Sequence, residues 1–313
     1  MDGKTVSAKS YANIAIIKYW GKEDSQKMIP STSSISLTLE NMFTQTTLTC
    51  LPDDAKSDLF YIDGVLQDEA EHAKMTAVLD RFRYGKRQFV RIDTTNNMPT
   101  AAGLSSSSSG LSALILAANK LFETNLSQEA LAQEAKFASG SSSRSFFGPI
   151  AAWDKKSGAV YPVETQLKLA MIVLVLNDQK KPISSREGMK RCHDTSTSFQ
   201  QWIEQSDKDY PQMLDYLAAG DFEKVGELTE QNALAMHETT RTSSPAFSYL
   251  TDQSYQAMEY VRALRKQGER CYFTMDAGPN IKVLCLEEDL ERLSKRFEED
   301  YTIIASRTKE IRR

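Results

Sequence analysis

Phosphate-binding chemistry is indicated by residues 99–110, which read PTAAGLSSSSSG and contain two glycines, five consecutive serines and no charge. Strand-forming residues precede this run at 89–94, and apolar residues at helical spacing follow it at 111–122. Glycines let a backbone approach an anion, and the N–H groups and dipole of a helix start favour negative charge. A flexible Gly/Ser linker has a similar composition, but it rarely joins a strand directly to an apolar-faced helix. The sequence therefore predicts a phosphate-binding loop that leads into a helix.

This loop is neither of the two most familiar nucleotide motifs. It lacks the Gly-Lys-Ser/Thr ending of a Walker A loop, and the chain contains no GxGxxG. A Rossmann dinucleotide site is therefore not expected.

Two further segments could bind an anion. Lys18 and Lys22 flank a Tyr-Trp pair after a short apolar stretch, residues 13–17, although an edge strand with solvated lysines would read the same way. Arg144 lies among small hydroxyl residues in SGSSSRSFFG, residues 139–148. A forked guanidinium among hydroxyls suits a phosphate or carboxylate, and the alternative is an exposed arginine after a helix.

A basic helix start and an acidic turn complete the candidates. Five basic residues lie in KKPISSREGMKR, residues 180–191, where Ser184 or Ser185 would cap a helix. Cations at a helix start oppose the helix dipole, and this is tolerated more readily if an anion lies between them. The alternative interpretation is a solvated basic face. In MDAGPN, residues 275–280, Asp276 is either part of a tight turn or a carboxylate presented at a strand end.

Composition limits the classes of partner. The chain has 313 residues, 41% hydrophobic and 26% charged, with a formal net charge of −4, as expected for a globular protein without a basic field for nucleic acid or membrane. Its longest apolar run, residues 169–176, is too short to span a bilayer. The four cysteines lack CxxC spacing, and the three histidines lie far apart. We therefore expect a cytoplasmic protein with reduced thiols, with histidines in surface or packing roles and with no metal-ligating side chains.

Strands and helices mix in both halves without strict alternation, so we expect an α+β fold. We place a domain boundary near residue 168, which gives domains 1–168 and 169–313. In the first domain we expect a strand at 34–51 and helices at 68–83 and 127–140, the last capped by Ser127 and ended by Gly140 as a C′ glycine. In the second domain we expect strands at 169–176, 271–275, 281–286 and 301–306, and helices at 185–237 (broken near 210–211 and 220–221), 252–268 and 290–298.

Taken together, these segments resemble the GHMP kinase superfamily. The loop form Pro-x-x-x-Gly-Leu-x-Ser-Ser fits Pro99, Gly103, Leu104, Ser106 and Ser107. Within the superfamily the chain resembles the diphosphomevalonate decarboxylase family, over segments 13–22, 99–104, 139–148, 184–189 and 276–280. It departs from that pattern in two places, with serine where relatives have an alanine in the run and with Pro149 where relatives often have glycine.

The resemblance implies a two-domain fold with a cleft between an N-terminal mixed α/β domain and a ferredoxin-like C-terminal domain. It implies ATP-dependent decarboxylation of (R)-5-diphosphomevalonate to isopentenyl diphosphate, with phosphorylation of the 3-hydroxyl, in isoprenoid biosynthesis. Asp276 would accept or orient the hydroxyl proton, Lys18 would keep Asp276 ionised, and Ser185 would orient the γ-phosphate.

The resemblance also implies two sets of binding residues. Mevalonate diphosphate would contact Asn13, Tyr19, Lys22, Ser139, Gly140, Ser141, Arg144, Arg186 and Met189, with its carboxylate on Arg144 and its diphosphate on Lys22 and Arg186. ATP would contact Pro99, Gly103, Ser105, Ser106, Ser107, Ser108, Ser109 and Lys181, with Mg²⁺ bridging its phosphates. Local cations, with Lys190 among them, would then bind polyanions despite the negative net charge. Relatives also suggest a homodimer.

Two other functions fit the same segments. One is a kinase that phosphorylates a mevalonate derivative without decarboxylation, against which the KYWGK and Arg144 segments argue. The other is a catalytically dead ligand sensor, against which the intact Asp276 and loop glycines argue.

Overall fold

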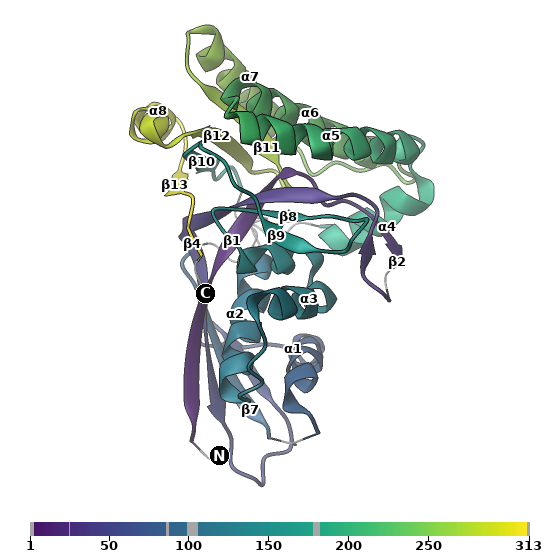
Figure 1. Ribbon diagram of the computed structural model, residues 1–313, viewed down its shortest axis with the longest axis vertical. Coiled ribbons are helices and arrows are strands. Elements are labelled where there is room, and N and C mark those ends of the chain that lie inside the picture. The colour runs from purple at the N-terminus through teal and green to yellow at the C-terminus, as the bar shows by residue number, and fades with distance from the viewer. Residues whose placement is uncertain (1–2, 25, 86–87, 99–105, 178–181, 312–313) are drawn as a thin grey trace.

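The computed structural model describes residues 3–24, 26–85, 88–98, 106–177 and 182–311 (Figure 1). Two sheets organise these residues, one of seven strands and one of four, beside a small two-stranded ribbon. The predicted α+β class is confirmed. In the described ranges, no helix is both long enough and apolar enough to cross a membrane.

The larger sheet is built on two long strands, β1 (Thr5–Ile17) and β4 (Ser34–Cys50), which pair antiparallel. The second edge of β4 pairs with β7 (Val90–Asn96) over residues 44–50 and with β8 (Ile150–Trp153) over residues 34–37. Thr and Leu are dense in β4, where inward residues alternate with half-exposed ones in its second half. The remaining strands are β5 (Leu59–Ile62), β6 (Val65–Leu66) and β9 (Val160–Pro162), and the ribbon is β2 (Lys22–Asp24) with β3 (Ile29–Pro30).

Three helices pack beside this sheet (Figure 1): α1 (Glu69–Arg83), α2 (Ser106–Leu121) and α3 (Gln128–Ala138). Ser127 caps α3 as predicted, because its side chain accepts a hydrogen bond from Ala130 N. The predicted loop differs in one respect, since Ser106–Ser109 form the first turn of α2. The serine run therefore supplies the helix N-terminus itself.

The residue after α3 also differs from the prediction. Gly140 follows the cap Ser139 but lacks the positive φ of a C′ glycine, and it begins the 3-10 helix η1 (Gly140–Phe146). A β-carbon at Gly140 would lie 2.7 Å from Cζ of Tyr19. Close packing, not a left-handed turn, requires glycine there.

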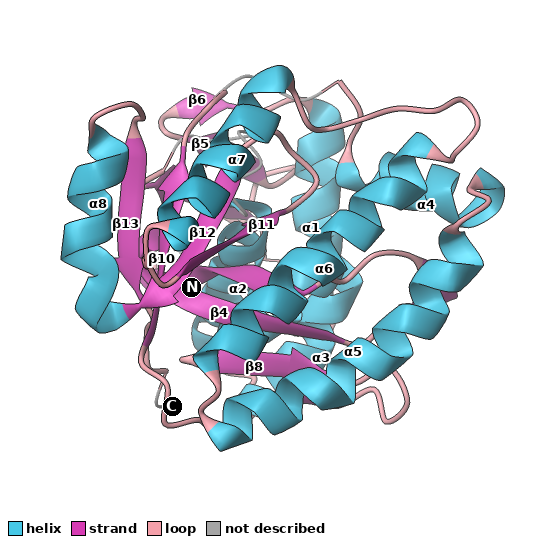
Figure 2. Cartoon of the chain, turned by 90° about the horizontal axis from the view of Figure 1, so that it is seen from above, coloured by secondary structure: helices cyan, strands magenta, loops and turns pink. Residues whose placement is uncertain are grey.

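The second sheet is antiparallel, in the order β11 (Cys271–Met275), β12 (Ile281–Leu286), β10 (Leu169–Leu174), β13 (Ile303–Arg307). Its helices are α4 (Ser185–Thr195), α5 (Phe199–Ala219), α6 (Phe222–Arg241), α7 (Asp252–Lys266) and α8 (Leu290–Glu298), with the short η2 (Glu287–Asp289) before α8. Helices α5 and α6 lie side by side (Figure 2). Both contact β1 of the larger sheet.

The helical stretch predicted at 185–237 is three helices. The break at Gly220 is confirmed, because Gly220 has φ +69° and Asp221 caps α6 by accepting from Lys224 N. The break predicted near Pro211 is wrong, since Pro211 lies inside α5. Proline there removes one helical hydrogen bond, but α5 buries Trp202 and Met213 against the core, and packing outweighs that local loss. A break at 196–198 was not predicted.

One apolar cluster joins the two halves of the chain. It combines Ile14 and Leu37 of the larger sheet with Met171 and Leu284 of the second sheet and Met213 of α5. Segments that are far apart in sequence are thereby held in fixed positions. The boundary near residue 168 falls between β9 and β10 and stays a prediction.

Candidate active site

A carboxylate between two ammonium groups lies where β1, β11 and β12 meet. Lys18 follows the last residue of β1, and its Nζ lies 2.9 Å from Oδ1 of Asp276, which follows the last residue of β11. The Nζ of Lys282, on β12, lies 3.5 Å from Oδ2 of the same carboxylate. Both lysines are buried, whereas the Asp276 side chain keeps 22% of its surface exposed. Asp276 is therefore a carboxylate presented at a strand end, with part of its side chain exposed and its Oδ2 buried.

The electrostatics of this cluster favour the ionised carboxylate. Desolvation opposes ionisation of Asp276, but the charges of Lys18 and Lys282 outweigh it and hold its pKa well below the ordinary range. Burial lowers the pKa of Lys18 to about 8, although Asp276 counteracts part of that shift. The expectation that Lys18 lies beside Asp276 agrees with this geometry, and the solvated-lysine alternative does not hold for Lys18.

Two members of this site were missed by sequence reasoning. Lys282 is a charged residue inside the apolar strand IKVLCL, and that conflict with the pattern was the available signal. His237, on α6, is buried near Lys18 and Asp276. Burial lowers the pKa of His237 to about 3, with the charge of Lys18 acting in the same direction, so its imidazole is neutral at physiological pH.

Arg144 is a buried cation that hydroxyl groups hold in place. Its Nε donates to Ser36 Oγ at 3.0 Å and its Nη1 to Ser34 Oγ at 2.6 Å, both on β4. No carboxylate among the described residues forms an ion pair with it, and burial lowers its pKa to about 10. A guanidinium that is 2% exposed is not a solvated surface arginine, and the arrangement suits an anionic ligand.

Unpaired polar atoms lie close to Arg144. Asn13 Nδ2 donates to Ser141 O and Ser145 Oγ, but its Oδ1 is buried and has no partner among the described residues. Tyr19 Oη is likewise buried without a hydrogen-bond partner among the described residues, and burial raises the pKa of Tyr19. The ring of Tyr19 packs over Gly140, and Ser139 Oγ lies 3.1 Å from Ser141 Oγ. Buried polar atoms without partners indicate a place where a polar ligand binds.

Helix α4 brings further candidates to the same region. Ser184, and not Ser185, is its N-cap, since Ser184 Oγ accepts from Glu187 N. Burial, together with the charge of Arg186, lowers the pKa of the half-buried Lys22, so these two cations lie near one another. Met189 packs against an apolar cluster that contains Trp20. Lys190 is not brought to the site, because it pairs with Asp194 on the exposed face of α4.

The N-terminus of α2 lies against the same part of β1, where Asn13 N donates to Ser108 Oγ at 3.5 Å. Ser109 Oγ lies 2.7 Å from Thr44 Oγ1, so this hydroxyl packs onto the sheet, whereas Ser107 is exposed. The first N–H groups of α2 have no partner within their own helix. Pro99, Gly103, Ser105 and Lys181 lie outside the described residues, as does the side chain of Ser106.

In the described part of the chain, no group of three His, Cys, Asp or Glu residues could hold a metal ion. Mg²⁺ commonly binds through substrate phosphates and water rather than in an all-protein cage. Serine hydroxyls at the start of α2, such as that of the exposed Ser107, are available to a phosphate as hydrogen-bond donors.

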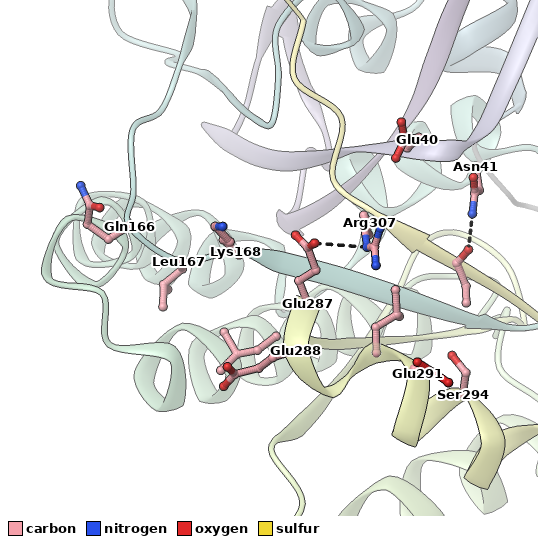
Figure 3. A pocket seen from close by; sticks show the side chains of 13 residues that line it. Glu40, Asn41, Gln166, Leu167, Lys168, Glu287, Glu288, Glu291, Ser294 and Arg307 are labelled. Carbon is pink, nitrogen blue, oxygen red and sulfur yellow. Dashed lines mark hydrogen bonds and ion pairs between the residues drawn. The ribbon is translucent and has the colours of Figure 1, made fainter.

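A groove of about 1020 Å³ lies elsewhere, between β12, α8 and β13 (Figure 3). Its walls carry Glu287, Glu288 and Glu291, and Arg307 pairs with Glu287 across it. None of the site residues above lines it. An acidic groove repels phosphate, so the anion chemistry belongs to the lysine and arginine cluster.

A helix start rich in serine, a strand-end carboxylate and several converging cations on two packed α+β units define a phosphoryl-transfer enzyme of the GHMP kinase type. Models of known families agree. Residues 10–161 match the diphosphomevalonate decarboxylase-like N-terminal domain, and residues 171–313 match the mevalonate 5-diphosphate decarboxylase C-terminal domain.

Individual relatives extend this agreement over nearly the whole chain. A diphosphomevalonate decarboxylase of Debaryomyces hansenii is 32% identical over 91% of this chain and 80% of its own length. The solved mevalonate pyrophosphate decarboxylase of Streptococcus pyogenes is 67% identical, with a TM-score of 0.96 over 100% of this chain and 99% of that one. A further structure, described as MDDEF in complex with MVAPP, AMPPCP and magnesium, is 38% identical with a TM-score of 0.91 over 98% of both chains. The chain belongs to the diphosphomevalonate decarboxylase family.

Proposed function

We propose that this enzyme catalyses the ATP- and Mg²⁺-dependent decarboxylation of (R)-5-diphosphomevalonate to isopentenyl diphosphate, ADP, phosphate and CO2. The observation that carries the proposal is the partly exposed Asp276 side chain, held between Lys18 and Lys282, beside an arginine with which no described carboxylate forms an ion pair. Membership of the family indicates the identity of the substrate, and the positive charges of the site suit a polyanionic molecule of this kind.

The roles of the chain's own residues follow from their charges. The ionised Asp276 orients the 3-hydroxyl and accepts its proton as the hydroxyl oxygen attacks the γ-phosphorus. The bond from that phosphorus to the β,γ-bridging oxygen breaks in the same step, and ADP leaves. Arg144, fixed by Ser34 and Ser36, binds the substrate carboxylate. Lys22 and Arg186 bind the diphosphate, with Asn13, Tyr19, Ser139, Gly140, Ser141 and Met189 shaping the substrate site.

Two bond-breaking steps then follow phosphorylation. The C3–O bond breaks with departure of phosphate, and positive charge develops at C3. The bond to the carboxylate carbon breaks next, and its electron pair forms the double bond as CO2 leaves. Asp276 is placed to stabilise the developing positive charge, and release of the carboxylate from Arg144 accompanies loss of CO2.

The nucleotide side is supported by the position of α2. Its N-terminal N–H groups, Ser106 to Ser109, are suited to bind phosphate, and Ser185 at the start of α4 is suited to orient the γ-phosphate. Mg²⁺ supplies charge neutralisation on the phosphates when ATP is bound. Roles for Pro99, Gly103, Ser105 and Lys181 stay predictions, as do a homodimer and a cytoplasmic location. Size-exclusion chromatography with light scattering tests the homodimer.

Replacement of Asp276 tests the reaction. We expect Asp276→Asn to lower kcat by about 10² to 10⁴, the range typical of lost proton-transfer assistance, while mevalonate diphosphate still raises the Tm. The exposed Asp300→Asn is the matched control and keeps wild-type kcat. ADP and CO2 are measured separately.

The product ratio separates the possible outcomes. Equal amounts of ADP and CO2 from the wild type support the decarboxylase. ADP without CO2 would assign a kinase, and ligand binding without turnover would assign a sensor. Full activity of Asp276→Asn would leave Asp276 as a turn residue only.

A further inference from the structure

A buried chain of side chains ends on the backbone of Lys18. Where β1 ends, Lys18 N donates to Oδ1 of Asn232, on α6, at 2.8 Å. Asn232 Nδ2 donates to Oδ2 of Asp209, on α5, at 2.8 Å, and Gln205 Nε2 donates to the second oxygen of Asp209 at 2.7 Å. Asn232 is fully buried and Asp209 is 1% exposed.

The order of donors and acceptors in this chain is fixed. A carboxylate that accepts from an amide forces the NH₂ group of Asn232 toward Asp209. The amide oxygen of Asn232 then faces Lys18 N, which can only donate. Asp209 therefore determines the orientation of Asn232, and Asn232 determines where the backbone of Lys18 lies.

The burial of the Asp209 carboxylate is energetically unfavourable at this place in the fold. No Lys, Arg or His among the described residues forms an ion pair with it. Burial of a carboxylate with only neutral amide donors is less favourable than burial of an apolar side chain of similar size. Core packing between α5 and α6 alone would not require it.

Two backbone carbonyls of this segment are also held, one by the loop before β4 and one by α5. Lys18 O accepts from Thr32 Oγ1 at 3.1 Å, and Trp20 O accepts from Nε1 of Trp202, on α5, at 3.2 Å. Lys18 Nζ is directed to Ala15 O at 2.7 Å and to Asp276. Backbone and side chain of Lys18 are thus fixed at opposite ends.

We propose that Asp209 and Asn232 are positioning residues for the reaction, which act through the backbone of Lys18 to hold its ammonium on Asp276. This inference rests on the proposed function of Asp276. It assigns helices α5 and α6, which carry no substrate-binding candidate, a part in the geometry of the site.

An exchange of the two side chains tests the proposal. In Asn232→Asp, two carboxylates face each other and the donor to Asp209 is lost. In the double variant Asp209→Asn/Asn232→Asp, Asn at 209 donates to Asp at 232, which still accepts from Lys18 N. We expect Asn232→Asp to lower kcat by about tenfold to a hundredfold with the KM for ATP unchanged, and the exchange to recover kcat to within about threefold of wild type.

Thr229→Val is the matched control, since Thr229 is buried on α6 and its hydroxyl donates to Val225 O within the same helix. It keeps wild-type kcat. The Tm of every variant is measured. A double variant no more active than Asn232→Asp would overturn the proposal, as would an Asn232→Asp variant with wild-type kcat.

The role of Asp276 in the reaction and the positioning role of Asn232 can be tested separately. If Asp276→Asn is inactive while Asn232→Asp is fully active, the proposed function stands and the positioning role does not. If Asp276→Asn is fully active, the proposed function of Asp276 fails first, whatever the exchange shows.

Discussion

Lys18 is a buried lysine whose protonation state changes with pH just above neutrality. Burial lowers its pKa to about 8, and the protonated form is the one that pairs with Asp276. As pH rises through about 8, Lys18 loses its charge and Asp276 loses one of its two cations. We therefore expect kcat/KM for mevalonate diphosphate to fall on the alkaline side with an apparent pKa near 8, measured as a pH–rate profile of the free enzyme.

Variants at position 18 identify the group that titrates. Lys18→Arg stays charged, so its alkaline limb moves to higher pH even if its activity is lower. Lys18→Met is weakly active at every pH and shows no such limb. A limb unchanged in Lys18→Arg would contradict the assignment and would point to Lys22, whose pKa is also lowered by burial.

Lys282 supplies the second cation on Asp276, and nothing else about its strand requires a charge. Its Nζ also donates to Asn280 O at 3.2 Å, which directs it toward the turn that carries Asp276. We expect Lys282→Met to lower kcat about tenfold, because one oxygen of Asp276 loses its partner, with little change in Tm since methionine fills a similar volume. The exposed Lys295→Met is the control. Unchanged kcat in Lys282→Met would show that Lys18 alone orients the carboxylate.

At the scale of elements, η1 and the segment after β1 are in close contact within the proposed substrate site. Gly140→Ala places a β-carbon against the Tyr19 ring, and the ring must move. We expect a rise of about tenfold or more in the KM for mevalonate diphosphate, whereas Tyr19→Phe, which keeps the ring and removes only the hydroxyl, has a smaller effect.

Gly148→Ala is the comparison for that variant. A β-carbon at Gly148 would meet Lys309 O of the C-terminal segment rather than a site residue. It should lower the Tm and leave the KM for mevalonate diphosphate near wild type. Equal KM values for Gly140→Ala and Gly148→Ala would contradict a specific role of the Tyr19 contact.

Local signals in the sequence predicted the elements that depend on local physics. β11, β12 and α8 have the predicted bounds, because alternation and helical spacing over short apolar runs are intrinsic to those segments. The Pro211 break was wrong because tertiary packing of α5 outweighs a local penalty. The role of Gly140 was misread because the ring that it accommodates belongs to a segment 121 positions earlier (140 − 19).

In the candidate site too, the residues in local motifs were predicted and those that depend on tertiary packing were not. Lys18, Arg144 and Asp276 were predicted because each lies in a short sequence motif. The structure brings the three residues together. Lys282 and His237 were missed because their relation to Asp276 exists only once β12 and α6 have packed. The Asp209–Asn232 pair is also invisible in sequence, since α5 and α6 place it.

For the whole molecule, the net charge of −4 and a polyanionic substrate are compatible because the cations are local. Lys18 and Lys282 are buried and pair with a single carboxylate, Asp276, and the buried Arg144 adds a third positive charge nearby. The excess positive charge there attracts phosphate while much of the acidic surface, such as the groove beside α8, lies elsewhere.

The shared core predicts how the molecule unfolds. Ile14, Leu37, Met171, Met213 and Leu284 belong to one apolar cluster, so neither half of the chain buries its own side of that cluster alone. The last segment adds to this, since Lys309 N donates to Thr38 O of β4. We therefore expect one calorimetric transition, with equal calorimetric and van't Hoff enthalpies, and no stable fold for fragments 1–168 or 169–313 expressed separately.

Ligands should shift that transition as a unit. Mevalonate diphosphate at about 100 times its Kd raises the free energy of unfolding by about 2.7 kcal/mol, because binding to the folded state alone is linked to stability. ATP should add to that shift with Mg²⁺ and much less after chelation with EDTA, since Mg²⁺ neutralises the charge of the ATP phosphates. Two resolved transitions, with only one of them moved by mevalonate diphosphate, would contradict both the shared core and a substrate site built from β1 and β11 together.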